Sequence, residues 1–212
     1  NAVWKETMER PHNLEKTLGA ALCVAVVGAD LLWQLTAGLQ IFTSETWRRS
    51  EIASTPRDLP DVLLEDERGQ TFPLRSLCGQ VMVLDFIYTR CPTVCKALGA
   101  TSSQLAQRFT QAGQAVTVMS VSFDPQYDHP QDLAAFKQSM EAQASTWRLA
   151  RPLHGTERDQ LLATAGVVVI PDGMQGYDHN AALHIVDKHC RITQLIDLED
   201  ITHAQRIVET LL

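Results

Sequence analysis

The sequence predicts an α/β fold in which helices flank a central mixed sheet. Residues 81–88 form an apolar run typical of a strand that is covered on both faces. Residues 115–123 alternate apolar and polar side chains, as a second strand does. Two further segments, 181–187 and 191–197, flank a tight turn at 188–190 and predict a strand hairpin.

The remaining elements follow from local start and stop signals. Residues 62–64 and 71–73 predict a small hairpin joined through 67–69. Four helices are expected, at 93–112 (ended by Gly113), 131–141, Thr156 to Gly166 (opened by a capping box with Asp159) and 202–211. A short strand is expected at 147–149. Strand–helix–strand, then a hairpin and a helix, is the order of a thioredoxin-like fold.

Composition limits the domain count and the partners. With 212 residues, 45 % of them hydrophobic and 20 % charged, the chain can form one sizeable core and an extension. We expect an N-terminal tail and transmembrane anchor in residues 1–50 and the thioredoxin-like domain in 51–212. The net charge of −7 argues against a nucleic-acid partner, because no basic stripe is available to meet phosphates.

The anchor prediction rests on residues 18–42, which are mostly apolar and carry one charge, Asp30. About 20 residues suffice to span a bilayer. Asp30 would cost roughly 2.5–3.5 kcal/mol at mid-bilayer, and a span over 18–35 places it near the interface instead. A cleaved signal peptide, with 27–29 as the cleavage site, and a soluble amphipathic helix are the alternatives. In an anchor, Cys23 would lie in the membrane, where we assign it no role.

Two cysteines, Cys91 and Cys95, stand where the first buried strand passes into a helix. Pro92 suits the first helical turn, and a spacing of four residues puts both sulfurs on one helix face, close enough to share a metal ion. The helix N-terminus favours thiolate, the form that binds metal or attacks disulfides. We expect this strand end to face solvent, so that the pair is exposed and not part of the core.

The spacing distinguishes the chemistries that such a pair can serve. Thioredoxin-type redox motifs have two intervening residues, whereas this pair has three. Structural zinc usually needs two such pairs, and there is no second one. Two thiolates with one imidazole would suit Cu(I). Among seven histidines, position favours His179, which follows a loop predicted at 171–178, whereas His184 falls mid-strand, where a packing role is expected.

Three separated motifs resemble the Sco/SenC family. They are Phe-Ile-Tyr-Thr-Arg-Cys-Pro-Thr-Val-Cys at 86–95, Ser-Phe-Asp-Pro at 122–125 with Asp128 and Pro130 following, and Tyr-Asp-His-Asn at 177–180. The resemblance covers roughly residues 59–212. Members of this family are copper chaperones with a thioredoxin-like fold that assist cytochrome c oxidase assembly. The resemblance implies that Cys91, Cys95 and His179 are copper ligands.

The resemblance also implies a location and a mode of action. The protein would be tethered to the inner membrane and face the periplasm, or the intermembrane space in a mitochondrion. Copper would pass by ligand exchange to the CuA centre of cytochrome c oxidase or another acceptor, so the protein would not be an enzyme. Oxidation of the pair would abolish binding, so a thiol reductant is expected as a partner. Asp124, Tyr88 and Asp178 are weaker candidates for supporting or docking contacts.

The rival interpretation is a membrane-tethered thiol–disulfide oxidoreductase in which Cys91 attacks and Cys95 resolves. The fold supports both functions. His179 distinguishes them, because exchange chemistry does not require a nitrogen ligand at that place.

Two more cysteines, Cys78 and Cys190, depart from the family pattern. In a thioredoxin-like sheet, strands 81–87 and 181–187 pair antiparallel, so the numbers of opposed residues have a constant sum. Placing Cys91 near His179 sets that sum at about 270, and 78 with 190 gives 268. We therefore predict a disulfide at the sheet end away from the copper site, which an exported location would permit.

Overall fold

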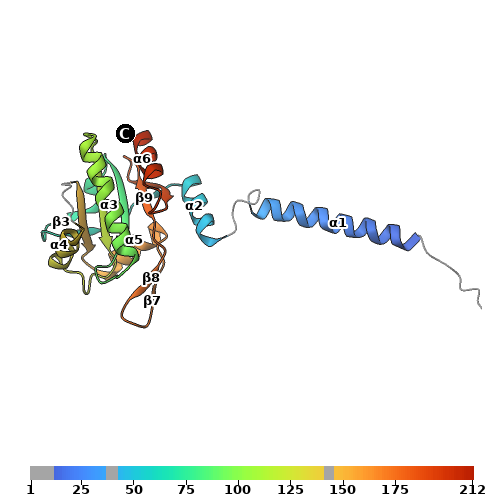
Figure 1. Ribbon diagram of the computed structural model, residues 1–212, viewed down its shortest axis with the longest axis horizontal. Coiled ribbons are helices and arrows are strands. Elements are labelled where there is room, and N and C mark those ends of the chain that lie inside the picture. Colours follow the sequence, from blue (N-terminus) through green and yellow to red (C-terminus); the bar gives the residue numbers. More distant parts are fainter. Residues whose placement is uncertain (1–11, 37–42, 141–145) are drawn as a thin grey trace, which may run out of the picture. The chain divides into compact units, whose positions relative to one another are not determined.

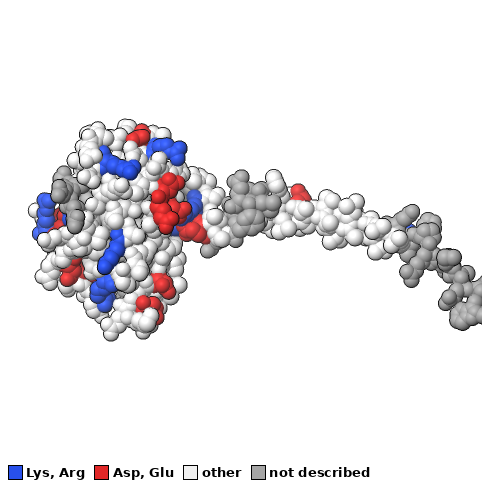
Figure 2. Space-filling model, viewed as in Figure 1, with Lys and Arg blue, Asp and Glu red and all other residues white. Residues whose placement is uncertain are grey.

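The computed structural model describes residues 12–36, 43–140 and 146–212. The chain divides into two compact units, residues 1–47 and 48–212 (Figure 1). The first unit contains helix α1 (His12–Leu35), of which residues 16–35 are long and apolar enough to cross a membrane by length and composition. The described part of α1 is largely uncharged on the face seen in Figure 2. The predicted tail at 1–11 and the end of the predicted span at 37–42 lie outside the described residues.

The second unit is built on an eight-stranded mixed sheet in the order β1-β10-β9-β4-β5-β6-β2-β3. Its strands are β1 (Arg57–Asp58), β2 (Leu63–Asp66), β3 (Thr71–Pro73), β4 (Val81–Ile87), β5 (Val116–Ser122), β6 (Trp147–Pro152), β9 (Leu183–Val186) and β10 (Arg191–Ile196). Strand β4 is central and buried along its whole length; it runs parallel to β5 and antiparallel to β9. The predicted thioredoxin-like fold is therefore confirmed.

Helices cover this sheet and complete the core. They are α2 (Ser44–Ser54), α3 (Val94–Gln111), α4 (Pro130–Ser139), α5 (Gly155–Ala165) and α6 (Ile201–Leu211), with a short 3-10 turn at Leu74–Leu77. Helices α3 and α6 contact each other and β4, whereas α4 and α5 both contact β6 (Figure 1). Large side chains such as Trp147 and Phe109 are completely buried between these elements. Because β4 and β5 are parallel neighbours, their carboxyl ends meet at one sheet edge.

The loop predicted at 171–178 is the turn of a second, two-stranded sheet, together with the strand residues at its two ends. Strands β7 (Val169–Pro171) and β8 (Tyr177–His179) pair antiparallel, so Pro171, Tyr177 and Asp178 lie in strands and not in a loop. The turn between them is closed by Asp172, whose Oδ1 accepts hydrogen bonds from the N–H groups of Met174 and Gly176. Glycine and proline signal the turn correctly, but the backbone pairing on either side has no local signature.

Two helix boundaries also differ from the prediction. Helix α5 begins with His154 as its N-cap, whose N–H donates to Glu157 Oε2 at 3.2 Å, so the predicted capping box of Thr156 and Asp159 is wrong. Asp159 instead pairs with Arg158. Helix α4 ends at Ser139, and residue 141, the predicted end, lies outside the described part of the chain.

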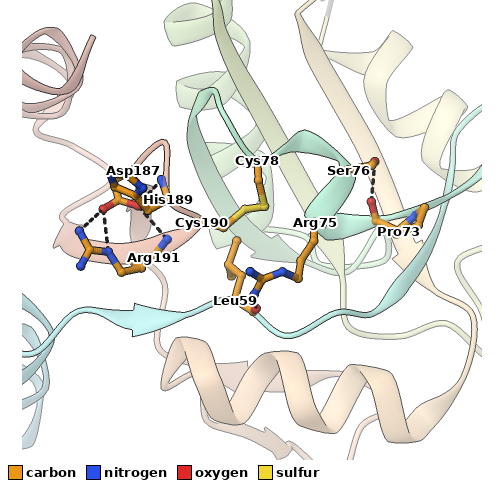
Figure 3. The surroundings of a disulfide bond; sticks show 9 residues. All are labelled: Leu59, Pro73, Arg75, Ser76, Cys78, Asp187, His189, Cys190 and Arg191. Atoms are coloured by element: carbon orange, nitrogen blue, oxygen red, sulfur yellow. Dashed lines mark hydrogen bonds and ion pairs between the residues drawn. A yellow bond between two sulfur atoms is a disulfide. The ribbon is translucent and has the colours of Figure 1, made fainter.

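The disulfide between Cys78 and Cys190 is present, with the two Cα atoms 5.2 Å apart (Figure 3). In the β4–β9 pair, Met82 opposes Val186 and Leu84 opposes His184, so opposed numbers sum to 268, as 78 and 190 do. The bridge ties the β9–β10 turn to the segment before β4. A backbone bond from Leu59 N–H to the Cys190 carbonyl, at 2.8 Å, reinforces it.

Candidate metal centre

Cys91 lies in the loop between β4 and α3, and Cys95 lies in the first turn of α3. The Cys91 N–H donates to the Tyr88 carbonyl at 3.2 Å, which turns the chain back after the strand. The Cys95 N–H then donates to Cys91 Sγ at 3.3 Å. This bond brings the two residues together. The predicted reason is wrong, because Cys91 and Pro92 precede the N-cap Thr93 and do not lie in the first helical turn. Both cysteines are reduced.

The pair is buried: Cys91 is 3 % exposed and Cys95 is fully buried. The expectation that this strand end faces solvent, leaving the site exposed, is therefore wrong. Aromatic side chains near the site form a cluster in which Tyr88, Phe123 and Tyr177 lie ring to ring at centroid distances of 5.3–5.6 Å. The sequence of the strand gives no sign of this cover, because Tyr177 comes from the distant β7–β8 hairpin.

His179 ends strand β8 and reaches the cysteine pair. Its Nε2 lies 3.7 Å from Cys95 Sγ. Its ring packs edge-on against the ring of Phe123, with the two ring centroids 5.0 Å apart. Burial lowers the pKa of His179, although the Asp178 carboxylate opposes the shift, so the imidazole is neutral at neutral pH. Within the described residues, the buried Nδ1 of His179 has no hydrogen-bond partner.

The two thiols differ in acidity. Burial opposes ionisation of Cys91, but hydrogen bonds from the Cys95 thiol and from the N–H groups of Cys95 and Thr93 outweigh it and lower the Cys91 pKa. Burial strongly raises the pKa of Cys95, and the neighbouring Cys91 and Asp85 raise it further. Cys95 thus keeps its proton, and its sulfur lies within hydrogen-bond reach of His179 Nε2. Cys91 is the thiol that ionises first.

These three side chains match the donor set of a soft metal ion, two sulfurs and one neutral nitrogen. They converge without forming a finished cage, because the described residues contain no group of three His, Cys, Asp or Glu side chains already placed to hold a metal. The side chains would have to turn toward a common ion. The Nε2 that now faces the Cys95 thiol is already directed at the sulfur pair.

The weaker site candidates have different surroundings. Tyr88 contacts the site: its hydroxyl accepts a hydrogen bond from the Tyr177 N–H at 3.2 Å, and its ring packs on Phe123. Asp124 is buried and pairs with Arg90, the residue before Cys91, at 2.7 Å. Asp178 is exposed on β8, and it influences the site through its charge on His179.

A buried carboxylate, to which the sequence analysis gave no role although it belongs to the second motif, holds the cysteine loop. Asp128 accepts hydrogen bonds from the Thr89 N–H at 2.9 Å, from the Thr89 hydroxyl at 2.6 Å and from the Ser122 hydroxyl at 2.5 Å. It is fully buried. Thr89 lies two residues before Cys91, so Asp128 fixes the end of the ligand loop. Its position four residues after Asp124 was the available signal.

Asp85, in the middle of β4, is a second buried carboxyl that the sequence analysis missed. It accepts hydrogen bonds from the hydroxyls of Ser102 and Ser120, yet burial raises its pKa to about 6. An apolar strand with one acidic residue is the sequence signal. Asp85 lies close enough to Cys95 to disfavour its thiolate.

A cavity of about 430 Å³ adjoins the site on the side of α5. Its lining includes Phe123 and Tyr177 from the aromatic cluster, together with Leu162 and Val169. Phe123 therefore stands between this cavity and His179, which it contacts.

Comparison with known proteins gives consistent relatives. The chain is 26 % identical over 124 residues to the SCO1 protein homolog of Bacillus subtilis (strain 168). That alignment covers 58 % of this chain and 64 % of the relative, so it spans less than two thirds of the relative's length.

Solved structures share the fold. Bradyrhizobium japonicum ScoI with copper bound has a TM-score of 0.63 and 21 % identity, covering 73 % of this chain and 99 % of ScoI. BsSco, a member of the Sco family of cytochrome c oxidase assembly proteins with a disulfide switch, has a TM-score of 0.61 and 20 % identity, covering 74 % and 96 %. At these identities, the likeness shows the fold alone.

The family assignment rests on a match to most of the chain. The SCO1/SenC family model matches residues 59–211, which contain every strand of the sheet except β1, both cysteines of the pair and His179. The chain belongs to the SCO1/SenC family.

Proposed function

We propose that this protein is a copper chaperone that binds copper through Cys91, Cys95 and His179. The observation that carries the proposal is the distance of 3.7 Å between His179 Nε2 and Cys95 Sγ, two residues that lie 84 positions apart in the sequence. The thiol of Cys91 lies beside them and accepts a hydrogen bond from the Cys95 N–H. Membership of the SCO1/SenC family supports it, as does the relative ScoI, whose structure holds copper.

The protonation states suit this role. Binding of Cu(I) by two thiolates and a neutral imidazole would release two protons, one from each thiol. Cys91, with its lowered pKa, would be the first sulfur to bind. The Cys95 thiol, with its raised pKa, would lose its proton only when the metal replaces it. The buried site would therefore not hold two negatively charged thiolates before copper binds.

The acceptor of the copper would be the CuA centre of cytochrome c oxidase. BsSco supports this assignment as a member of a family of cytochrome c oxidase assembly proteins. Copper would leave as it came, by exchange of one protein ligand at a time, with no substrate bond made or broken. Helix α1 would anchor the chain in the inner membrane, facing the periplasm or the mitochondrial intermembrane space, within an N-terminal region of residues 1–50.

Neighbouring side chains would support the exchange. Tyr88 would hold the β7–β8 hairpin, and with it His179, through its hydroxyl bond to Tyr177. Asp124 would hold Arg90 beside Cys91 and could contact the acceptor through that arginine. Asp178 would tune His179 by its charge. A thiol reductant would return the pair to the dithiol form after oxidation.

A second function, thiol–disulfide oxidoreductase, is favoured by one observation. Cys91 has a lowered pKa and Cys95 a raised one, the division between an attacking and a resolving thiol. The position of His179 favours copper instead, because disulfide exchange leaves it without a role.

Copper titration of the full-length protein in detergent distinguishes the two functions. We expect one equivalent of Cu(I) for the reduced wild type, loss of binding in Cys91→Ser, and much weaker binding in His179→Ala. His189→Ala is the matched control, because His189 is exposed in the β9–β10 turn at the far end of the sheet. Binding that is indifferent to His179 would overturn the three-ligand site. Disulfide-exchange activity that survives in His179→Ala would then support the oxidoreductase.

A further inference from the structure

The hairpin that carries His179 is closed at its base by the next residue, Asn180. Asn180 Oδ1 accepts a hydrogen bond from the Val168 N–H at 2.7 Å, and its Nδ2 donates to the Gly166 carbonyl at 3.0 Å. In the described part of the chain, β7 and β8 pair with each other and with no strand of the main sheet. The backbone at His179 is therefore positioned by contacts at the hairpin base more than by a sheet ladder.

Arg48 of helix α2 reaches the same carbonyl. Its Nη1 donates to the Gly166 carbonyl at 3.1 Å and to the Ala165 carbonyl at 3.3 Å, at the C-terminal end of α5. A cation there also meets the negative end of the helix dipole. Gly166 has φ of 67°, and a Cβ at this position would stand 3.0 Å from Arg48 Cδ, so glycine allows both the helix end and the approach of the arginine.

The part of helix α2 from Arg48 onward is held against the thioredoxin-like domain by two further contacts. Ile52, one turn after Arg48, is completely buried in the core, and Arg49 pairs with Asp197 at 2.5 Å. The SCO1/SenC family model begins at residue 59, so α2 and Arg48 lie outside the region that defines the family. The guanidinium is thus supplied by a chain segment beyond the family core.

We propose that Arg48 is a positioning residue for His179, acting through the Gly166 carbonyl and the Asn180 side chain. A carbonyl oxygen has two lone pairs, and at Gly166 one meets Arg48 while the other meets Asn180. Removing the guanidinium takes a charged donor from this carbonyl and from that of Ala165. The hairpin base then loosens, and the imidazole loses its fixed distance to the sulfur pair. The cysteines themselves do not contact this network. This inference rests on the proposed copper site.

The test is a double-mutant cycle on the full-length protein in detergent, read as Cu(I) affinity by competition with a chromogenic chelator. We expect Arg48→Met to weaken binding about fivefold when His179 is present, the factor that corresponds to the net contribution of one ordinary hydrogen bond. In the His179→Ala background, Arg48→Met should change nothing, because the two thiols bind without the hairpin. Equal loss in both backgrounds, or no loss in the wild type, would overturn the proposal.

Two further variants sharpen the result. Arg48→Lys should restore affinity, because both bonds come from the single atom Nη1 and an ammonium can make both. Arg57→Met is the matched control: Arg57 Nη1 donates to the Thr164 carbonyl at 3.2 Å at the same helix end, so its loss should leave copper affinity unchanged. If Arg48→Met does not fold, Arg48→Gln takes its place in the cycle.

Hydrogen exchange gives a second readout that does not need copper. The Val168 amide, bonded to Asn180, should exchange faster in Arg48→Met and at the wild-type rate in Arg57→Met. If the wild type shows no His179-dependent copper binding, the proposed function fails. Unchanged protection of Val168 in Arg48→Met would separately overturn the positioning role.

Discussion

Replacing both bridged cysteines, as Cys78→Ala with Cys190→Ala, should destabilise the domain while sparing the copper site. The bridge joins residues 112 positions apart. A cross-link over about 100 residues removes roughly 4.7 kcal/mol of chain entropy from the unfolded state, and removing native bridges typically costs about 2–5 kcal/mol. We therefore expect the free energy of unfolding to fall by about 3–5 kcal/mol.

The assay is urea denaturation of the full-length protein in detergent, followed by tryptophan fluorescence, in which the fully buried Trp147 reports the domain. Cys23→Ala is the control for loss of a cysteine, since Cys23 is exposed on α1 and unbridged. Copper affinity should not change, because the bridge precedes β4 and the ligand loop follows it, a strand length apart. A loss below about 1 kcal/mol would refute the entropic argument, and a change in copper affinity would refute the separation of bridge and site.

Three further predictions follow from buried groups around the site. The pKa of Asp85 rises from 3.8 to about 6 on folding, so its contribution to stability is present below pH 4 and is lost as the pH rises through 6. Asp85→Asn should remove this loss of stability in unfolding curves measured from pH 4 to 8. A pH profile of stability that is the same in Asp85→Asn as in the wild type would contradict the assignment. Asp128→Ala removes the acceptor of the Thr89 N–H and hydroxyl. The free energy of unfolding should therefore fall by about 2–4 kcal/mol, and copper binding should weaken. Wild-type copper affinity in a folded Asp128→Ala variant would show that Thr89 does not hold the ligand loop. Tyr88→Phe removes the acceptor of the Tyr177 N–H. The Tyr177 amide should therefore exchange faster, and the free energy of unfolding should fall by about 1 kcal/mol. Exchange of the Tyr177 amide at the wild-type rate would show that the Tyr88 hydroxyl does not hold the hairpin.

Local sequence signals predicted most of the fold, with errors where pairing partners are distant. Strand 81–88 was recognisable as a continuous apolar run, and helix 93–112 by the glycine that ends it. The β7–β8 hairpin was read as a loop because its strands are three residues long and rich in turn formers. The start of α5 was misplaced for a similar reason: Glu157 caps it while also accepting the Leu63 N–H from a distant strand.

The disulfide shows how far register arithmetic can reach. Once two strands are known to be antiparallel, one contact fixes every other pair, so 78 and 190 could be matched across 112 residues. No comparable rule exists for side chains that meet through loops, such as Arg48 with Gly166 or Asp128 with Thr89.

The chemistry available to this protein can be read from its residues alone: a cysteine pair before a helix, a histidine after a turn, and the order of strands and helices that carries them. The surroundings of these groups became known only from the folded chain. It buried Cys95, which raised the pKa of its thiol, and it buried the imidazole of His179, which lowered the pKa of that ring. Burial and electrostatic environment are sums over neighbours from the whole chain, and so no local pattern of residues encodes them.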